Sequence, residues 1–157
     1  MKNMNKAAIA RMAIGMSLAL AGWFATAAFA DSHGVVGEKI ADFSASITSV
    51  TYEKHRTIVN MESDGTIGEF GTVQATATLM HPTSANPPTG VYNLRGASFR
   101  ADGSVVPFSG RGTWKSLGDL RWRLRSIGLA ADGVQSMSVG ILELKSRSMK
   151  GSVYALD

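Results

Sequence analysis

Apolar and polar residues alternate with a period of two along several stretches of this chain. From Val73 to Leu79 every second residue is apolar, and the residues between them are Gln or Thr. The stretch from Val106 to Trp114 alternates in the same way. Because successive side chains of a β-strand point to opposite faces, the pattern predicts strands with one packed and one solvated face. We therefore expect an all-β fold.

Turn signals divide the chain into short segments. Asp64-Gly65, Asp102-Gly103 and Asp132-Gly133 are Asp-Gly pairs, which favour the tight turn of a β-hairpin. Prolines interrupt residues 82–90, and proline cannot donate to a sheet ladder. Seven or eight strands with short connections favour a single closed antiparallel barrel, and a β-sandwich is the alternative. The expected strands span about 40–49, 50–61, 66–80, 90–101, 104–116, 119–130, 134–146 and 149–156.

One segment fits two periods. From Leu120 to Arg125, apolar residues alternate with three arginines, as in a strand. The apolar residues between Leu117 and Ile127 also fit helical spacing. The strand is favoured, because glycines bracket the segment and a hairpin signal follows it.

The interior of the predicted barrel combines large rings with very small residues. An eight-stranded barrel is either filled by side chains or just open enough for one small ligand. Small inward positions such as Ala75, Ala77, Gly110 and Gly112 leave room either for aromatic rings or for a cavity. The residues expected to ring a ligand are Tyr92, Phe108, Trp114 and Trp122.

Residues 1–30 have the pattern of a bacterial signal peptide. Three basic residues precede the apolar run Met12–Ala21, and Ala28-Phe29-Ala30 fits a small-x-small cleavage site. The competing interpretation is an uncleaved anchor, because the run from residue 12 to 30 is nearly long enough to span a bilayer. With cleavage favoured, residues 31–157 form one domain, in which 31–39 is a flexible leader. The expected location is the periplasm or the medium.

Removal of residues 1–30 changes the charge balance. The whole chain has 16 basic and 12 acidic residues, and the first thirty hold three of the basic ones. The rest therefore carries 13 basic and 12 acidic residues, a net charge of +1. This balance does not support binding to nucleic acid.

Cleavage after Ala30 would expose the sequence Asp31-Ser32-His33. A free amine, two backbone amides and the third-position imidazole can hold Cu(II) or Ni(II) in a square plane. The start resembles the amino-terminal copper- and nickel-binding motif of serum albumins. A polar leader that contains a histidine by chance is the other interpretation, so no resident cofactor is expected and any metal there would be adventitious.

Glu53 and His55 are the candidates for acid–base chemistry. They are two residues apart, so on a strand they would share a face. With His81 they could also form a two-histidine, one-carboxylate metal site. A solvated strand face is the competing interpretation.

Four arginines form the strongest electrostatic feature. Arg121, Arg123 and Arg125 would line one face of one strand, and Arg111 could lie on a neighbouring strand. Like charges at this spacing repel, which suggests an anionic partner such as lipid or polysaccharide. The alternative is a solvated outer face. An outward face of this kind would not tolerate lipid tails, so the cleaved chain is not expected to span a membrane.

The second half of the chain resembles small exported barrels of the allene oxide cyclase-like and lipocalin-like types. The likeness lies in the rhythm of TGVYNLRGASFRADG, PFSGRGTW and DLRWRLRSIG, and covers about residues 89–157. The lipocalin Gly-x-Trp motif is absent from its usual place near the amino terminus; Gly112-Thr113-Trp114 comes late. The resemblance implies a barrel that binds an apolar or amphipathic small molecule, or isomerises one without a cofactor.

Three functions therefore stay open from the sequence. The preferred one is binding of a small apolar or amphipathic ligand. The second is a cofactor-free isomerase or cyclase-like enzyme that uses Glu53 and His55. The third is an envelope-associated interaction protein that uses the arginine-rich strand.

Overall fold

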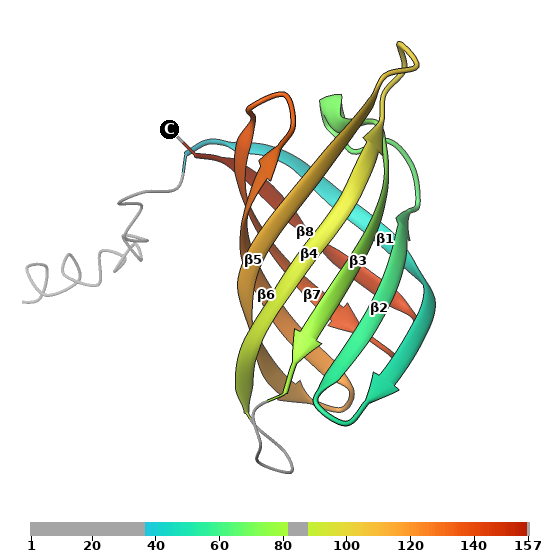
Figure 1. The fold of residues 1–157 in the computed structure, drawn as a ribbon, viewed down its shortest axis with the longest axis vertical. Coiled ribbons are helices and arrows are strands. Elements are labelled where there is room, and N and C mark those ends of the chain that lie inside the picture. Colours follow the sequence, from blue (N-terminus) through green and yellow to red (C-terminus); the bar gives the residue numbers. More distant parts are fainter. Residues whose placement is uncertain (1–36, 82–87, 157) are drawn as a thin grey trace, which may run out of the picture. The chain divides into compact units, whose positions relative to one another are not determined.

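The computed structural model describes residues 37–81 and 88–156, which form a closed antiparallel barrel (Figure 1). Each strand pairs with the next, and β8 pairs with β1 to close the sheet. The predicted all-β barrel is confirmed, and closure excludes the sandwich alternative. The strands of the described part are β1 (Lys39–Glu53), β2 (Arg56–Ser63), β3 (Thr72–Met80), β4 (Thr89–Phe99), β5 (Val105–Gly118), β6 (Arg121–Ala130), β7 (Gln135–Glu143) and β8 (Ser148–Ala155).

The alternation in the sequence corresponds to the inside and outside of the barrel. In β3, Ala77 and Leu79 are buried and Gln74 is exposed. In β6, Leu124 is buried between the exposed Arg123 and Arg125. The segment with two possible periods is therefore a strand, as predicted.

The predicted break between two strands at residues 49 and 50 is wrong. β1 continues through this point to Glu53, and the chain turns at Lys54-His55. The register with β2 shifts between Ile47 and Ser49, which marks a β-bulge. The bulge absorbs one residue, so that Ile47 and Val50 can both pack against the core. The alternation of inward and outward side chains is therefore interrupted at the bulge, although β1 continues through it.

The Asp-Gly pairs have two different outcomes. Asp102-Gly103 and Asp132-Gly133 form tight hairpin turns, with glycine φ angles of 84° and 92°. Asp64-Gly65 instead begins a longer connection that contains the 3-10 helix η1 (Gly68–Phe70), so β3 starts at Thr72 rather than at residue 66.

Asp64, at the start of this connection, is held against β1. Its carboxylate accepts hydrogen bonds from the hydroxyls of Ser44 and Ser46, at 2.5 and 2.6 Å. The chain then folds inward at Ile67, whose amide donates to the carbonyl of Gly71 at 2.8 Å, and Ile67 is buried. The connection therefore covers part of one end of the barrel.

The expected flexible leader ends earlier than residue 39. The amide of Gly37 donates to the carbonyl of Ala155 at 3.0 Å, and that of Ala155 donates to the carbonyl of Glu38 at 2.9 Å. These bonds join the residues before β1 to the end of β8. Residues 31–36 lie outside the described part of the chain.

Aromatic rings lie over glycines between β4 and β5. Gly90 is in register with Trp114, and Gly112 with Tyr92. A Cβ atom added at Gly90 would lie 2.5 Å from the Trp114 ring, and one at Gly112 would lie 2.7 Å from the Tyr92 ring. Because glycine has no side chain, both rings can lie across the neighbouring strand and be almost completely buried.

We expect Gly112→Ala to destabilise the barrel and Gly128→Ala to be tolerated. The new methyl group at residue 112 would lie 2.0 Å from the carbonyl oxygen of Arg125, which the sheet holds in place. Overpacking of this kind costs about 1–3 kcal/mol of unfolding free energy. At Gly128 the nearest atom is 3.5 Å away, so the unfolding free energy should stay within about 1 kcal/mol of the parent value. Urea unfolding measures both, and equal losses would contradict the steric explanation.

Candidate functional site

The barrel contains an apolar cavity of about 150 Å³ at one end, and the cavity is partly open to solvent. This is the end that carries η1 and the β4–β5 and β6–β7 turns, at the top of Figure 1. The polar side chains of the lining are all serines. The lining consists of Phe43, Ala45, Met61, Ser63, Ile67, Phe70, Val73, Ala75, Leu94, Ser98, Phe108, Ser126, Gly128, Leu129, Ala130, Val134, Ser136, Ser138, Met149 and Val153.

The cavity exists because side chains fill the barrel interior at one end and leave it partly empty at the other. Trp114, Tyr92, Leu124 and Leu142 are at most 2% exposed and pack together in a single core cluster. The cavity half instead places alanines, serines and Gly128 on its wall. Small side chains on facing strands leave volume that no neighbouring ring fills.

Hydroxyl groups mark the boundary between the cavity and the packed half. The hydroxyls of Ser126 and Ser138, on β6 and β7, are 2.8 Å apart and both residues line the cavity. The buried phenol of Tyr92, which belongs to the packed half, lies near the same two serines. Burial raises the pKa of the Tyr92 phenol, and hydrogen bonding with Ser126 and Ser138 acts in the opposite direction. Among the side chains of the cavity wall, only serine hydroxyls can donate or accept a hydrogen bond to a polar group of a bound molecule.

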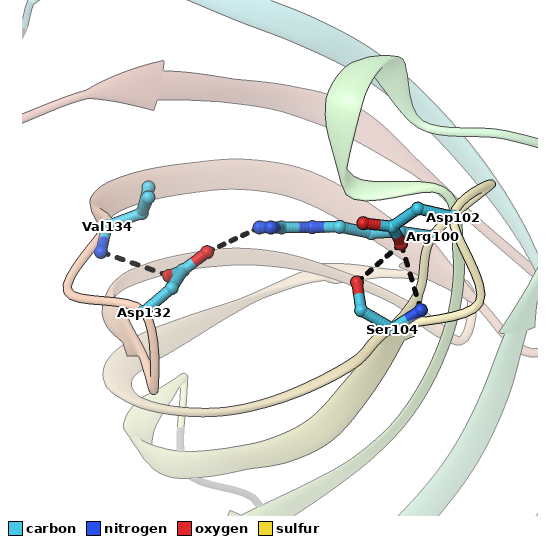
Figure 2. Close-up of polar contacts among 5 residues, drawn as sticks. All are labelled: Arg100, Asp102, Ser104, Asp132 and Val134. Atoms are coloured by element: carbon cyan, nitrogen blue, oxygen red, sulfur yellow. Dashed lines mark hydrogen bonds and ion pairs between the residues drawn. The ribbon is translucent and has the colours of Figure 1, made fainter.

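An ion pair spans two turns at the cavity end of the barrel (Figure 2). Arg100 follows β4 and extends to the carboxylate of Asp132 in the β6–β7 turn. Hydrogen bonding to Arg100 is the main cause that lowers the pKa of Asp132. The amide of Val134, a cavity-lining residue, also donates to Asp132 at 3.2 Å. The guanidinium charge of Arg100 is thus already neutralised.

The four residues expected to ring a ligand are divided between the two halves. Phe108 lines the cavity. Tyr92 and Trp114 are buried in the core and Trp122 packs against that core, so none of these three lines the cavity. The Trp114 indole donates to the carbonyl of Met80 at 3.2 Å, on the side of the barrel interior away from the cavity.

Several residues of the wall were not expected from the sequence. Phe43, Phe70, Met61 and Met149 line the cavity, and none of them is among the four residues expected to ring a ligand. Phe43 could have been found, because it alternates with Ala45 and Ile47 on the inward side of β1. Phe70 follows no strand period, since it lies in η1.

Glu53 and His55 do not lie along one strand. Glu53 ends β1 and His55 is in the following turn, both exposed, and Glu53 accepts a hydrogen bond from Arg56 at 2.6 Å. His81 is joined to His55 only through the backbone, because its imidazole lies 2.7 Å from the hydroxyl of Thr57 and edge-on to Trp114. Within residues 37–81 and 88–156, no three His, Asp or Glu side chains are grouped as metal ligands. The Asp31-Ser32-His33 motif lies outside the described residues.

The four arginines of the anion-binding hypothesis all lie on the outside of the barrel. Arg111 is on β5 and Arg121, Arg123 and Arg125 are on β6, and each is exposed. The cavity lining includes none of them. The ligand-binding and anion-binding hypotheses therefore concern opposite faces of the same sheet.

Comparisons with known proteins leave the site to be interpreted from its own geometry. No protein-family model, no curated protein sequence and no solved structure matches this chain. Among the residues that the structure describes, no helix is long and apolar enough to cross a bilayer.

We expect Tyr92 to make the stability of the barrel sensitive to alkaline pH. Its folded pKa is raised, so the unfolded chain releases the phenolic proton first, and stability is lost as pH rises from about 10 through the folded pKa. Tyr92→Phe cannot ionise, so its free energy of unfolding should not share this loss. Urea unfolding between pH 7 and 11 should show the parent protein losing free energy of unfolding relative to Tyr92→Phe above pH 10. Parallel curves would contradict the assignment.

Proposed function

We propose that the protein binds one small neutral molecule, apolar or weakly amphipathic, in the barrel cavity. The observation that carries the proposal is an apolar cavity of about 150 Å³ in a barrel whose other half is close-packed. An apolar cavity of this size can hold a molecule as large as benzene. Protein interiors are normally filled, so a space of this size is a candidate binding site.

The wall of the cavity favours a neutral ligand over an ion. Arg100, the cation beside the cavity-lining Val134 turn, is paired with Asp132. The polar groups on the wall are serine hydroxyls, which can orient a single hydroxyl, carbonyl or N–H group of a ligand. A charged ligand would lose hydration without gaining an opposite charge.

The cavity gives little support to the isomerase alternative. Its described lining holds no carboxylate, imidazole, ammonium, guanidinium or thiol group. General acid–base catalysis needs such a group within hydrogen-bond reach of the substrate. Glu53 and His55 lie at the β1–β2 turn, at the other end of the barrel (Figure 1). Binding is therefore preferred to catalysis, and the signal-like pattern of residues 1–30 favours binding outside the cytoplasm.

Methionine methyl groups offer a direct test with indole as the probe. Met61 and Met149 line the cavity, whereas Met80 lies at the exposed end of β3. In protein labelled at the methionine methyls with carbon-13, indole should shift the signals of Met61 and Met149 by its ring current and leave Met80 unchanged. We expect a dissociation constant of about 0.1–1 mM, which suits nine non-hydrogen atoms.

Two variants decide whether the shifts come from the cavity. Gly128→Leu should abolish them, because residue 128 points inward and the new side chain would occupy the cavity. Thr113→Leu adds a similar apolar group on the exposed face of β5 and should leave binding unchanged. Shifts that survive Gly128→Leu in a folded protein, or no shifts in the parent protein at 5 mM indole, would refute the proposal.

A further inference from the structure

Positive charge is concentrated on one outer face of the barrel. β4, β5 and β6 are adjacent, and their sequences contain six cationic residues and no Asp or Glu. All six side chains are exposed. This basic face consists of Arg95, Arg111, Lys115, Arg121, Arg123 and Arg125.

The charges of the basic face are not balanced within the described residues. The ion pairs found there involve Lys39, Arg56, Arg100 and Lys145, and none of the six. Lys115 is even in direct register with Arg123, and like charges in such positions destabilise a sheet. Glu143 is in register with Arg121, but the ion pairs found among the described residues do not include one between them. The face thus keeps its charge available to an external anion.

Large apolar side chains continue the same outer surface toward the cavity end. Ile127 is 60% exposed and in register with Arg111, and Leu129 is 53% exposed. Val105 and Phe99 face each other on β5 and β4 and are 55% and 41% exposed. Strands β4 to β6 therefore present cations and apolar groups side by side.

We propose that the basic face docks onto the surface of an anionic phospholipid bilayer. Lipid phosphates neutralise clustered Arg and Lys side chains, and exposed apolar side chains gain by entering the interface beside the headgroups. A soluble polyanion would explain the cations but not Ile127, Leu129 and Val105. A second copy of the same face is disfavoured, because six cations would meet six others.

Docking in this way does not depend on the barrel cavity. The residues of the basic face point outward, and none of the six lines the cavity. Leu129, one of the exposed apolar residues beside the basic face, also lines the cavity. A bilayer bound at this face would therefore lie beside the cavity end of β6.

Co-sedimentation with vesicles tests the proposal. The protein is expressed from its full sequence, and mass spectrometry establishes that every variant has the same amino terminus. The vesicles contain either phosphatidylcholine alone or phosphatidylcholine with 30% phosphatidylglycerol. We expect at least tenfold stronger partitioning to the anionic vesicles, and loss of that difference between 50 and 500 mM NaCl.

Charge-matched variants locate the contact. R111Q/R123Q/R125Q should weaken binding to anionic vesicles at least tenfold. K39Q/K54Q/R56Q removes the same number of positive charges, but from β1, the β1–β2 turn and β2, which lie across the barrel from β5. This variant should weaken binding to anionic vesicles less than threefold. Circular dichroism and thermal unfolding confirm that both variants are folded. Equal weakening by the two variants would overturn the proposal.

A third variant separates a bilayer from a soluble polyanion. V105S/I127S keeps all the charges and should weaken partitioning to anionic vesicles about three- to tenfold. The same variant should bind dextran sulfate like the parent protein. If V105S/I127S binds the vesicles as well as the parent does, or if anionic vesicles are not preferred at all, the bilayer is not the partner of this face.

Discussion

The interior of this barrel depends on the contact between aromatic rings and glycine backbone across β4 and β5. Tyr92 and Trp114 can lie inside because Gly112 and Gly90 stand opposite them and leave the space that each ring occupies. Phe108 makes the same kind of contact with Gly96. The rings of Tyr92 and Trp114 belong to the close-packed core, whereas that of Phe108 lines the cavity. Phe43, Phe70 and Phe108 also line the other half, but they do not fill the space left by its alanines, serines and Gly128, and the cavity remains.

Charged groups are kept out of this interior and are distributed unevenly outside it. The described cavity wall holds only apolar residues and serines, so the barrel can bury a neutral molecule without burying a charge. The outer surface of β4 to β6 carries cations alone, while β1 and β2 carry Asp42, Glu53 and Glu62 as well as Lys39 and Arg56. A chain with almost no net charge after residue 30 thus has one strongly positive face. The net charge alone does not reveal this uneven distribution of charged residues over the outer surface.

The two proposals use the two sides of one sheet. Alternation places Leu124 and Ser126 inside and Arg123 and Arg125 outside on the same strand, β6. Substitutions on one side therefore need not disturb the other, and each proposal can be tested while the other surface stays intact. Leu129 lies where the two surfaces meet.

The sequence by itself determined the class of the fold and the direction of most side chains. Period-two alternation and the turns at Asp102-Gly103 and Asp132-Gly133 are local properties, so the order of residues alone is enough to predict them. The bulge in β1 and the connection that holds Asp64 against Ser44 and Ser46 could not be predicted in this way, because each depends on a partner distant in sequence. Only the tertiary structure decided where the cavity lies. Its position depends on which rings meet which glycines across the closed sheet, and register between strands is not a property of any one strand.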